Sequence, residues 1–291
     1  MQVTLTRRDA LKLTAIGGGV VFASRLPGRK ALAANDDFFF VQLSDTHWGF
    51  EDPKANPDPR SSLQEAIGAV AALSRAPDFV VFTGDLTHKT DDAAVRRKRM
   101  AEFKEIIRPL SGLRTIFLPG EHDAAADQGA AFKEAFGATH QSFDHKGIHF
   151  VTLDNVSDPK GVGVAQLSWL ASDLKPLDPM RPLVILTHKP LWDLKPDWDW
   201  FTPDGAQVIE LLAPFKAATV FYGHIHQEIH HVTGNVTHIS ARSALYPLPA
   251  PGAQPQKAPL PWNPAATDHG IGWRTVVATG AALATAEHSI V

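Results

Sequence analysis

Short runs of apolar residues, each ending in polar or glycine residues, recur along the chain after residue 37. Phe38 to Leu43 is the first such run, and Asp78 to Phe82 and Thr115 to Leu118 repeat the pattern. Dense apolar runs of this length are typical of buried strands. We therefore predict strands at these three places and at residues 148–153, 183–186, 219–222, 236–240, 275–279 and 281–286.

Between these runs, apolar residues recur at intervals of three and four, which is the spacing of one helix face. The segment 61–74 shows this spacing, with Leu63, Ile67 and Val70 in phase. Strands that alternate with helices indicate an α/β fold. No internal repeat or linker divides the chain, so we expect one catalytic domain. The predicted helices cover residues 61–74, 93–107, 165–174 and 206–212.

The first 33 residues follow a different pattern. Arg7 and Arg8 precede an apolar stretch, Leu11 to Ala23, that is too short and too rich in glycine to span a membrane. Small residues follow at Ala31 and Ala33, the two positions that a signal peptidase recognises. The segment resembles a twin-arginine export signal. It predicts export machinery as a partner, cleavage that leaves residues 34–291, no stable membrane span afterwards, and a periplasmic or otherwise exported protein. A basic amphipathic helix is the alternative interpretation.

The composition limits the kinds of partner and of metal site that the chain can have. A net charge of -3 and the lack of a large basic block give no support to a nucleic-acid partner. We interpret the run Arg96 to Arg99 as a solvated helix face rather than a phosphate-binding patch. Cysteine is absent, which excludes disulfides and thiolate metal sites. Any metal would therefore be held by nitrogen and oxygen ligands, and the 14 histidines are many for 291 residues.

Five of the predicted strands end in a turn that carries Asp, Glu or His. In open α/β sheets ligands bind outside the carboxyl ends of the strands, where the loops converge. We therefore expect these turns to form one site. In chain order they are Asp45-Thr46-His47, Gly84-Asp85, Gly120-Glu121-His122-Asp123, His188 and Gly223-His224-Ile225-His226.

The order of these turns resembles the calcineurin-like metallophosphoesterases along essentially the whole mature chain. The resemblance implies an α/β fold, a four-layer αββα sandwich of two mixed β-sheets with two metal ions at the strand ends. It also implies a hydrolase of small phosphodiesters or phosphomonoesters that acts by attack of metal-bound hydroxide. Among the subgroups, the set of turns resembles the class III cyclic-nucleotide phosphodiesterases as much as any other, which is a weak guide to substrate.

Matching positions assigns roles to eight side chains. Asp85 corresponds to the bridging carboxylate, and His122 to the histidine above the substrate phosphate. The ligands of the first metal would be Asp45, His47 and His226, and those of the second Glu121, His188 and His224.

The chemistry of these residue types agrees with the roles. Imidazole and carboxylate ligands suit two divalent or mixed-valence transition-metal ions, with Mn, Fe or Zn expected. Two ions about 3.5–4 Å apart clamp a displacement at phosphorus and activate a water. We expect Asp85 to bridge through both of its oxygens. His122 could stabilise phosphoryl charge or protonate the leaving oxygen. Asp123 could orient the His122 ring or cap the following helix.

The sequence departs from the family pattern at two positions. Glu121 stands where Asn is usual, which brings the ligand charge to -3 against +4 for two divalent ions and predicts slower catalysis. A metal-binding or interaction protein with little or no turnover is the alternative function. Purple acid phosphatases carry a tyrosine three residues after the bridging Asp, whereas this chain has His88 there and only two tyrosines. We therefore expect no iron–tyrosinate site, and His88 as a loop residue.

Two long loops follow candidate ligands. The segment Trp192 to Phe201 comes after the His188 strand, so its tryptophans could stack on a substrate or could anchor the loop. The Pro-rich loop Tyr246 to Pro264 has the length of a lid, but none of its residues indicates a substrate.

Overall fold

The computed structural model describes residues 37–290. The predicted export signal, residues 1–33, lies outside them and remains a prediction, as does the boundary at residue 34. Within the described part, no helix is long and apolar enough to cross a membrane.

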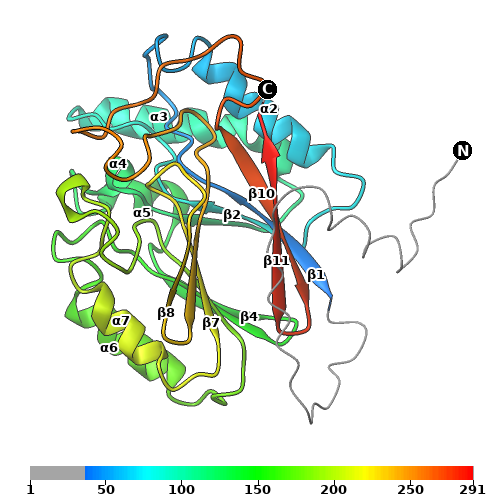
Figure 1. The fold of residues 1–291 in the computed structure, drawn as a ribbon, viewed down its shortest axis with the longest axis vertical. Helices are drawn as coiled ribbons and strands as arrows, with labels where there is room; N and C mark the ends of the chain where they lie inside the picture. Colours follow the sequence, from blue (N-terminus) through cyan, green and yellow to red (C-terminus); the bar gives the residue numbers. More distant parts are fainter. Residues whose placement is uncertain (1–36, 291) are drawn as a thin grey trace, which may run out of the picture. The chain divides into compact units, whose positions relative to one another are not determined.

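Strands and helices alternate along the chain (Figure 1). The strands are β1 Phe38–Leu43, β2 Phe79–Thr83, β3 Thr115–Leu118, β4 Gln141–His145, β5 Ile148–Thr152, β6 Leu183–Leu186, β7 Ala218–Tyr222, β8 His230–Thr233, β9 Val236–Ser240, β10 Gly272–Thr279 and β11 Ala282–Ser289. The helices are α2 Pro59–Ala71, α3 Ala93–Ile106, α4 Glu121–Ala124, α5 Ala130–Phe136, α6 Gly163–Leu174 and α7 Gly205–Leu212, with short 3-10 helices at Arg108–Leu110 and Pro196–Trp198.

The strands form two mixed sheets. One has the order β11-β10-β1-β2-β3, in which β1, β2 and β3 are parallel. The other has the order β4-β5-β6-β7-β9-β8, in which the four central strands are parallel. The outer strands of each sheet run antiparallel to their neighbours, apart from β3. Parallel central strands place the turns after β1, β2, β3, β6 and β7 at the same end of the sandwich, as the site prediction requires.

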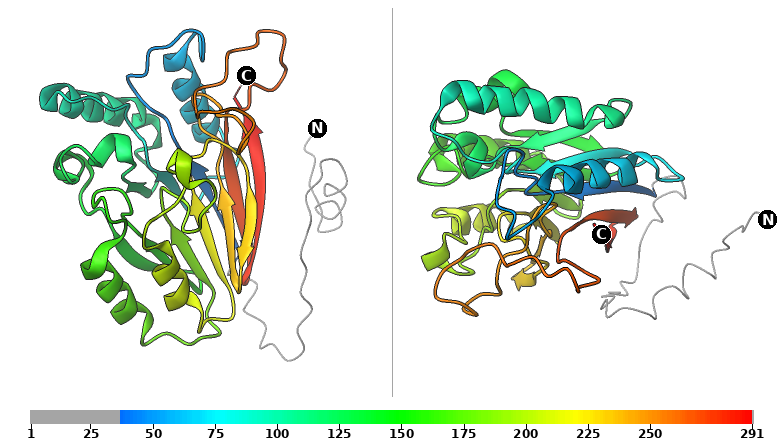
Figure 2. Two further views of the ribbon diagram at one scale, coloured as in Figure 1. Left: turned by 60° about the vertical axis from the view of Figure 1, so that its left-hand side comes forward. Right: turned by 90° about the horizontal axis from the view of Figure 1, so that it is seen from above.

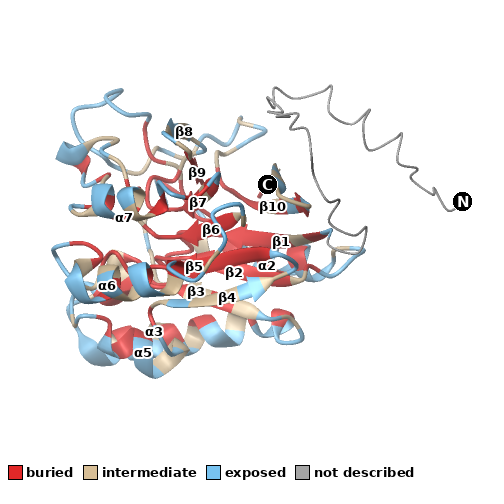
Figure 3. Cartoon of the chain, turned by 90° about the horizontal axis from the view of Figure 1, so that it is seen from below, coloured by how far each residue is buried: buried red, intermediate tan, exposed pale blue. Residues whose placement is uncertain are grey.

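Three apolar layers explain the four-layer packing (Figure 2). On β1, Phe38 and Phe40 point between the two sheets, whereas Val41 and Leu43 point toward the helices on the other face. On β7, Phe221 lies between the sheets and Val220 packs with the residues under α6 and α7. Strands buried on both faces need apolar residues at consecutive positions, which is why they appear as continuous apolar runs. Figure 3 shows β1, β2, β5, β6 and β7 in red, as buried strands, whereas the edge strand β4 is tan and pale blue. The predicted αββα sandwich is confirmed.

Side-chain caps begin the two helices that flank the first sheet. Asp58 precedes α2 and accepts the Ser61 N–H at 3.1 Å, with Pro59 in the first turn of the helix. Asp92 precedes α3 and accepts the Ala94 N–H at 2.8 Å.

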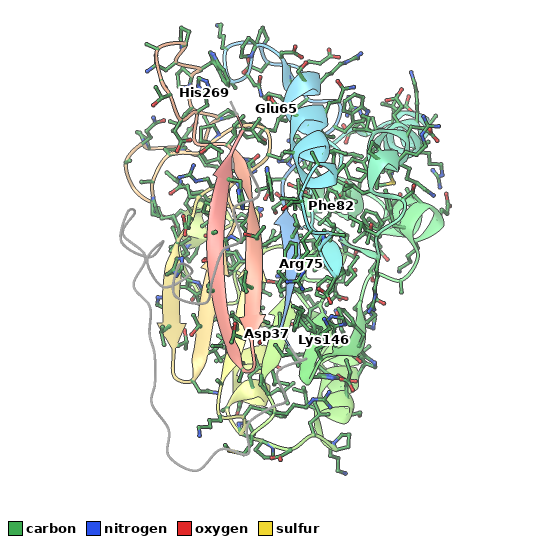
Figure 4. All side chains as sticks on the ribbon, turned by 90° about the vertical axis from the view of Figure 1, so that its right-hand side faces the viewer. Asp37, Glu65, Arg75, Phe82, Lys146 and His269 are labelled. Carbon is green, nitrogen blue, oxygen red and sulfur yellow. The ribbon has the colours of Figure 1, made fainter. Side chains whose placement is uncertain are left out.

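At the opposite end of the molecule from the polar turns, the Lys146 ammonium donates to the Asp37 carbonyl (Figure 4).

Most predicted elements are confirmed within a few residues, and the additional ones are short. The apolar and polar pattern of the sequence did not predict α4, α5, β4 or β8. Strands β4 and β8 are partly exposed edge strands, so they lack a continuous apolar run. β10 and β11 extend beyond the predicted ranges, to Gly272–Thr279 and Ala282–Ser289.

Candidate metal centre

The polar turns have an unusual backbone conformation. Asp45, His47, Asp85, His224 and His226 all have positive φ angles, between 42° and 65°. Non-glycine residues adopt this left-handed region rarely, and such strain gathers at functional sites. Here the strained residues are five of the seven predicted metal ligands.

Glycines beside the ligands allow the turns to approach closely. Gly84 has a φ of +96°, and a Cβ atom there would lie 2.3 Å from Nδ1 of His188. A Cβ atom on Gly223 would lie 1.9 Å from the Ser44 hydroxyl and 2.5 Å from an Asp45 oxygen. Each glycine therefore leaves room for a ligand that follows a strand of the other sheet.

One group of donor atoms forms at the turns after β1 and β7. Asp45, His47 and His226 are buried, and each offers an atom within reach of a single ion. Nε2 of His47 lies 3.2 Å from Nε2 of His226, which in turn lies 3.3 Å from Oδ1 of Asp45. Asp45 also accepts the main-chain N–H of His224 at 3.0 Å. These are the residues predicted for the first metal.

A second group contains Asp85, Glu121, His188 and His224. The Glu121 carboxylate joins two of its histidines, with Oε2 at 2.8 Å from Nε2 of His188 and Oε1 at 3.0 Å from Nδ1 of His224. The structure therefore directs Glu121 into the site and places it among the residues predicted for the second metal.

Asp85 connects the two groups through one oxygen. Its Oδ2 lies 3.6 Å from Nε2 of His47 and 3.5 Å from Nε2 of His188. The other oxygen, Oδ1, accepts the main-chain N–H of His122 at 2.9 Å. The expectation that Asp85 bridges two ions through both of its oxygens stays a prediction. Oδ2 alone faces both groups, while Oδ1 fixes the turn that carries Glu121.

Main-chain carbonyls orient three of the four candidate ligand histidines. Nδ1 of His188 donates to the Thr83 carbonyl at 2.7 Å, and Nδ1 of His226 to the Tyr246 carbonyl at 2.7 Å. Nε2 of His224 donates to the Asp199 carbonyl at 2.9 Å. Each bond occupies one ring nitrogen and directs the other toward the carboxylates, so that second nitrogen is the one that could bind a metal. Metal-binding histidines are commonly oriented in this way.

The charge state of the carboxylates suits cations. Although burial raises the pKa of Glu121, the charges of His224 and His188 hold that pKa well below its usual value. Burial also raises the pKa of Asp85, as does Glu121, but the neighbouring His122, His188 and His47 bring it below its usual value. Both carboxylates are therefore ionised at neutral pH. Carboxylates with imidazole nitrogens beside them form a donor set that fits two transition-metal ions.

His122 faces both groups from the start of α4. Its Nε2 lies 4.0 Å from Oδ2 of Asp85 and 3.9 Å from Oε1 of Glu121. Its Nδ1 accepts the main-chain N–H of Lys89 at 3.1 Å. That bond leaves the ring proton on Nε2, the nitrogen directed at the site.

Asp123 does not orient the His122 ring, so that prediction is wrong. Its buried carboxylate accepts the main-chain N–H groups of Leu86 and Thr87, both at 2.9 Å, and that of Gly120 at 3.0 Å. The bond from Gly120 caps α4, as the alternative prediction held. Asp123 thus joins the turn after β2 to the turn after β3. Burial and the charge of Asp85 raise the pKa of Asp123 to about 6.

Two further side chains reach the site. His88 was interpreted as a loop residue, yet its ring centroid lies 4.9 Å from that of His122 and 5.6 Å from that of His47. Burial and the nearby His122 and Arg99 lower the pKa of His88 to about 4, so the ring is neutral. Tyr246, the first residue of the Pro-rich loop, places its hydroxyl 3.3 Å from Nε2 of His47. Its position 20 residues after His226 gave no local signal.

The tryptophans of the Trp192–Phe201 segment pack against the protein and do not point toward a substrate. Trp198 and Trp200 are buried in the core under α6 and α7. Trp192 stacks on His231 of β8, with ring centroids 3.7 Å apart. The anchoring interpretation is therefore confirmed for Trp198 and Trp200. The segment still serves the site, because the Asp199 carbonyl orients His224.

The basic run on α3 is not a uniformly solvated face. Arg96 is buried and pairs with Asp127 at 2.9 Å. Arg97 pairs with Glu134, and Arg99 donates to the His88 carbonyl at 2.8 Å. Successive residues of a helix point about 100° apart, so consecutive arginines face different surroundings.

Comparison with known proteins agrees with this geometry. The family model for the calcineurin-like phosphoesterases matches residues 40–228. A probable cyclic nucleotide phosphodiesterase of Rhodococcus erythropolis is 27% identical over 195 residues, which cover 64% of this chain and 60% of the relative. The serine/threonine-protein phosphatase CPPED1 of Danio rerio is 25% identical over 217 residues, covering 65% of this chain and 70% of the relative. A crystal structure of a dimetal phosphatase from Danio rerio has the same fold, with a TM-score of 0.64, 14% identity and coverage of 87% and 96%.

Proposed function

The chain belongs to the calcineurin-like phosphoesterase family, and from this premise we propose that it is a metal-dependent hydrolase of phosphoric esters with two metal ions. The observation that supports two ions most directly is Oδ2 of Asp85, which lies 3.6 Å from His47 and 3.5 Å from His188. One carboxylate oxygen that faces two groups of donors suits a bridging ligand. When bound, two such ions neutralise phosphoryl charge and lower the pKa of water at the site.

His122 is the proposed catalytic residue of the chain itself. Its Nε2 carries the ring proton, because Nδ1 accepts from Lys89. Its distances of 4.0 Å from Asp85 and 3.9 Å from Glu121 place that N–H beside the donors of both ions. From there it can donate a hydrogen bond to a phosphoryl oxygen and pass a proton to the leaving alkoxide.

A small phosphodiester or phosphomonoester is the proposed substrate class. The relatives named above are a probable cyclic nucleotide phosphodiesterase and a serine/threonine-protein phosphatase, two names that share only a phosphoester as the bond to be hydrolysed. A cavity of about 220 Å³ adjoins His47 and is lined by the side chains of Trp48, Arg60 and Arg99 among others. This volume is below the usual range for a whole ligand, so the cavity suits one part of a substrate. Three basic side chains, Arg60, Lys98 and Arg99, and two acidic ones, Glu51 and Glu102, line it, which leaves an excess of one positive charge.

The test is metal content followed by turnover. The purified protein would be reconstituted with Mn, Fe or Zn, and release of nitrophenol from bis- and mono-p-nitrophenyl phosphate would be measured. We expect two metal equivalents and hydrolysis that Asp85→Asn abolishes. Two bound equivalents without turnover on any phosphoester would favour the alternative, a metal-binding protein on this fold.

We further propose export by the twin-arginine route, on the strength of Arg7, Arg8 and the small residues at Ala31 and Ala33. Mass spectrometry of periplasmic protein should find a chain that begins at Ala34. Replacing both arginines by lysine should stop export. A periplasmic protein with residues 1–33 intact would refute this proposal.

A further inference from the structure

Asn155, which follows β5, makes four hydrogen bonds with its side-chain amide at the turn that carries His188. The residue is 2% exposed. Its Oδ1 accepts the main-chain N–H groups of His188 at 3.3 Å and of Lys189 at 3.2 Å. Its Nδ2 donates to the Lys189 carbonyl at 2.9 Å and to the Thr202 hydroxyl oxygen at 2.8 Å. Both donors and both lone pairs of the amide are therefore used.

The turn after β6 differs from most of the other ligand turns in its backbone. Five of the seven predicted metal ligands have positive φ angles, but His188 is not one of them. The Thr83 carbonyl orients the His188 ring, which leaves the main chain to be fixed by other contacts. Beyond the end of β6, the N–H groups of His188 and Lys189 both bond to Asn155. A side chain from β5 thus fixes this turn, whereas a left-handed backbone shapes the others.

The same amide is also connected to the second histidine of the group, His224. Its partner Thr202 follows Asp199 by three residues, and the Asp199 carbonyl accepts the Nε2–H of His224 at 2.9 Å. The Thr202 hydroxyl in turn donates to the Pro190 carbonyl at 2.8 Å. The bonds of Asn155 therefore join the turn after β6 to the loop that orients His224. Both histidines of the second group depend on this one side chain.

We propose that Asn155 is a positioning residue that holds the two histidines of the second group at the spacing a metal ion requires. The inference rests on the metal centre proposed above, and Asn155 acts there only through other residues. Small shifts of these histidines matter, because metal–ligand distances are held to within about 0.2 Å. None of the four bonds of Asn155 reaches the first group, so the ligands of the first metal should stay in place.

Calorimetric titration of the metal-free protein with Mn separates the two binding steps. Asn155→Ala removes all four hydrogen bonds of the amide. Asn235→Ala is the matched control, because Nδ2 of Asn235 also donates to two main-chain carbonyls, those of Leu212 and Phe215. Asn235 precedes β9, whose first residue pairs with the first residue of β7, so it lies at the opposite end of these strands from the site.

We expect Asn155→Ala to bind the second Mn at least about tenfold more weakly, with the first step unchanged, since partners that orient metal ligands contribute this much to affinity. Asn235→Ala should keep both steps. The Mn concentration that gives half-maximal turnover should rise in Asn155→Ala by the same factor as the second dissociation constant. A residue with a merely structural role would lower the stability of the metal-free protein without weakening one metal selectively.

An unaltered second step in Asn155→Ala would overturn the assignment, and so would equal weakening of both steps. If circular dichroism shows that Asn155→Ala does not fold, Thr202→Val decides in its place. That variant removes one acceptor of the amide and should weaken the second step at least about twofold, the lower limit for one hydrogen bond; no change would overturn the assignment. Native protein that binds fewer than two metal ions would instead refute the metal centre itself, so the two failures are distinguishable.

Discussion

Glu121 offers the most informative perturbation, because it is the residue at which the chain departs from its family. Its two oxygens contact both histidines of the second group, at 2.8 and 3.0 Å. Its pKa is held well below the usual value by His224 and His188, so alanine removes a full charge and a ligand at neutral pH. Glu121→Gln removes the charge but keeps the length of the side chain.

The expected magnitudes follow from these contacts. In Glu121→Ala the second ion retains Asp85, His188 and His224, three of four donors. Removing an outer partner of a metal ligand weakens affinity about 10–100-fold, so loss of a direct ligand should weaken it at least about 100-fold. That factor corresponds to about 2.8 kcal/mol. The first site should change little, because Glu121 is not among its donors.

Calorimetric titration with Mn measures both steps, and hydrolysis of bis-p-nitrophenyl phosphate follows turnover. We expect Glu121→Gln, and Glu121→Asn with the residue usual in the family, to keep two ions. The second ion should bind more weakly but act as a better electrophile, with equal or higher turnover. Glu105→Ala, an exposed glutamate of α3, serves as the control. Two unaltered binding steps in Glu121→Ala would refute the assignment of Glu121 as a ligand.

Three further predictions concern other residues. Asp85→Asn should lose both metals, because its Oδ2 faces both groups; elemental analysis showing two retained equivalents would contradict this. His122→Ala should keep its metals and lose at least about tenfold in turnover number, measured on the metal-loaded variant. Burial lowers the pKa of His238 to about 4, so the folded state resists protonation and stability falls as the pH drops below about 6.5. Between pH 7.5 and 5, urea unfolding should show a loss about 2 kcal/mol smaller in His238→Leu than in the native protein.

Much of the fold followed from local patterns. The strands that surround the site are buried on both faces, so their apolar runs were continuous and their ends were sharp. The polar turns stood out because Asp, Glu and His interrupt these runs directly. The edge strands β4 and β8 were not predicted, because a partly exposed strand has polar residues between its apolar ones and its sequence resembles that of a loop. The short helices α4 and α5 offer too few turns for a periodic signal.

The orientation of the site residues needed the packed chain. Asp123 was expected beside the His122 ring because the two are adjacent in sequence. Consecutive residues of a helix point in different directions, so Asp123 turned inward to the main chain of Leu86 and Thr87. His88 and Tyr246 were predicted as loop residues without a place at the site. No local pattern shows which loop packs against which turn, so their contacts with His47 could not be predicted.

The sequence by itself therefore determined the elements and the types of residue at the strand ends, since burial and turn formation are short-range and leave a periodic record. The tertiary structure decided which atom of each residue faces the site. Oδ2 of Asp85 faces both groups while the His122 N–H holds Oδ1, and His226 presents Nε2 because the Tyr246 carbonyl holds Nδ1. These choices depend on hydrogen bonds between turns from distant strands. Such contacts exist only once both sheets have packed.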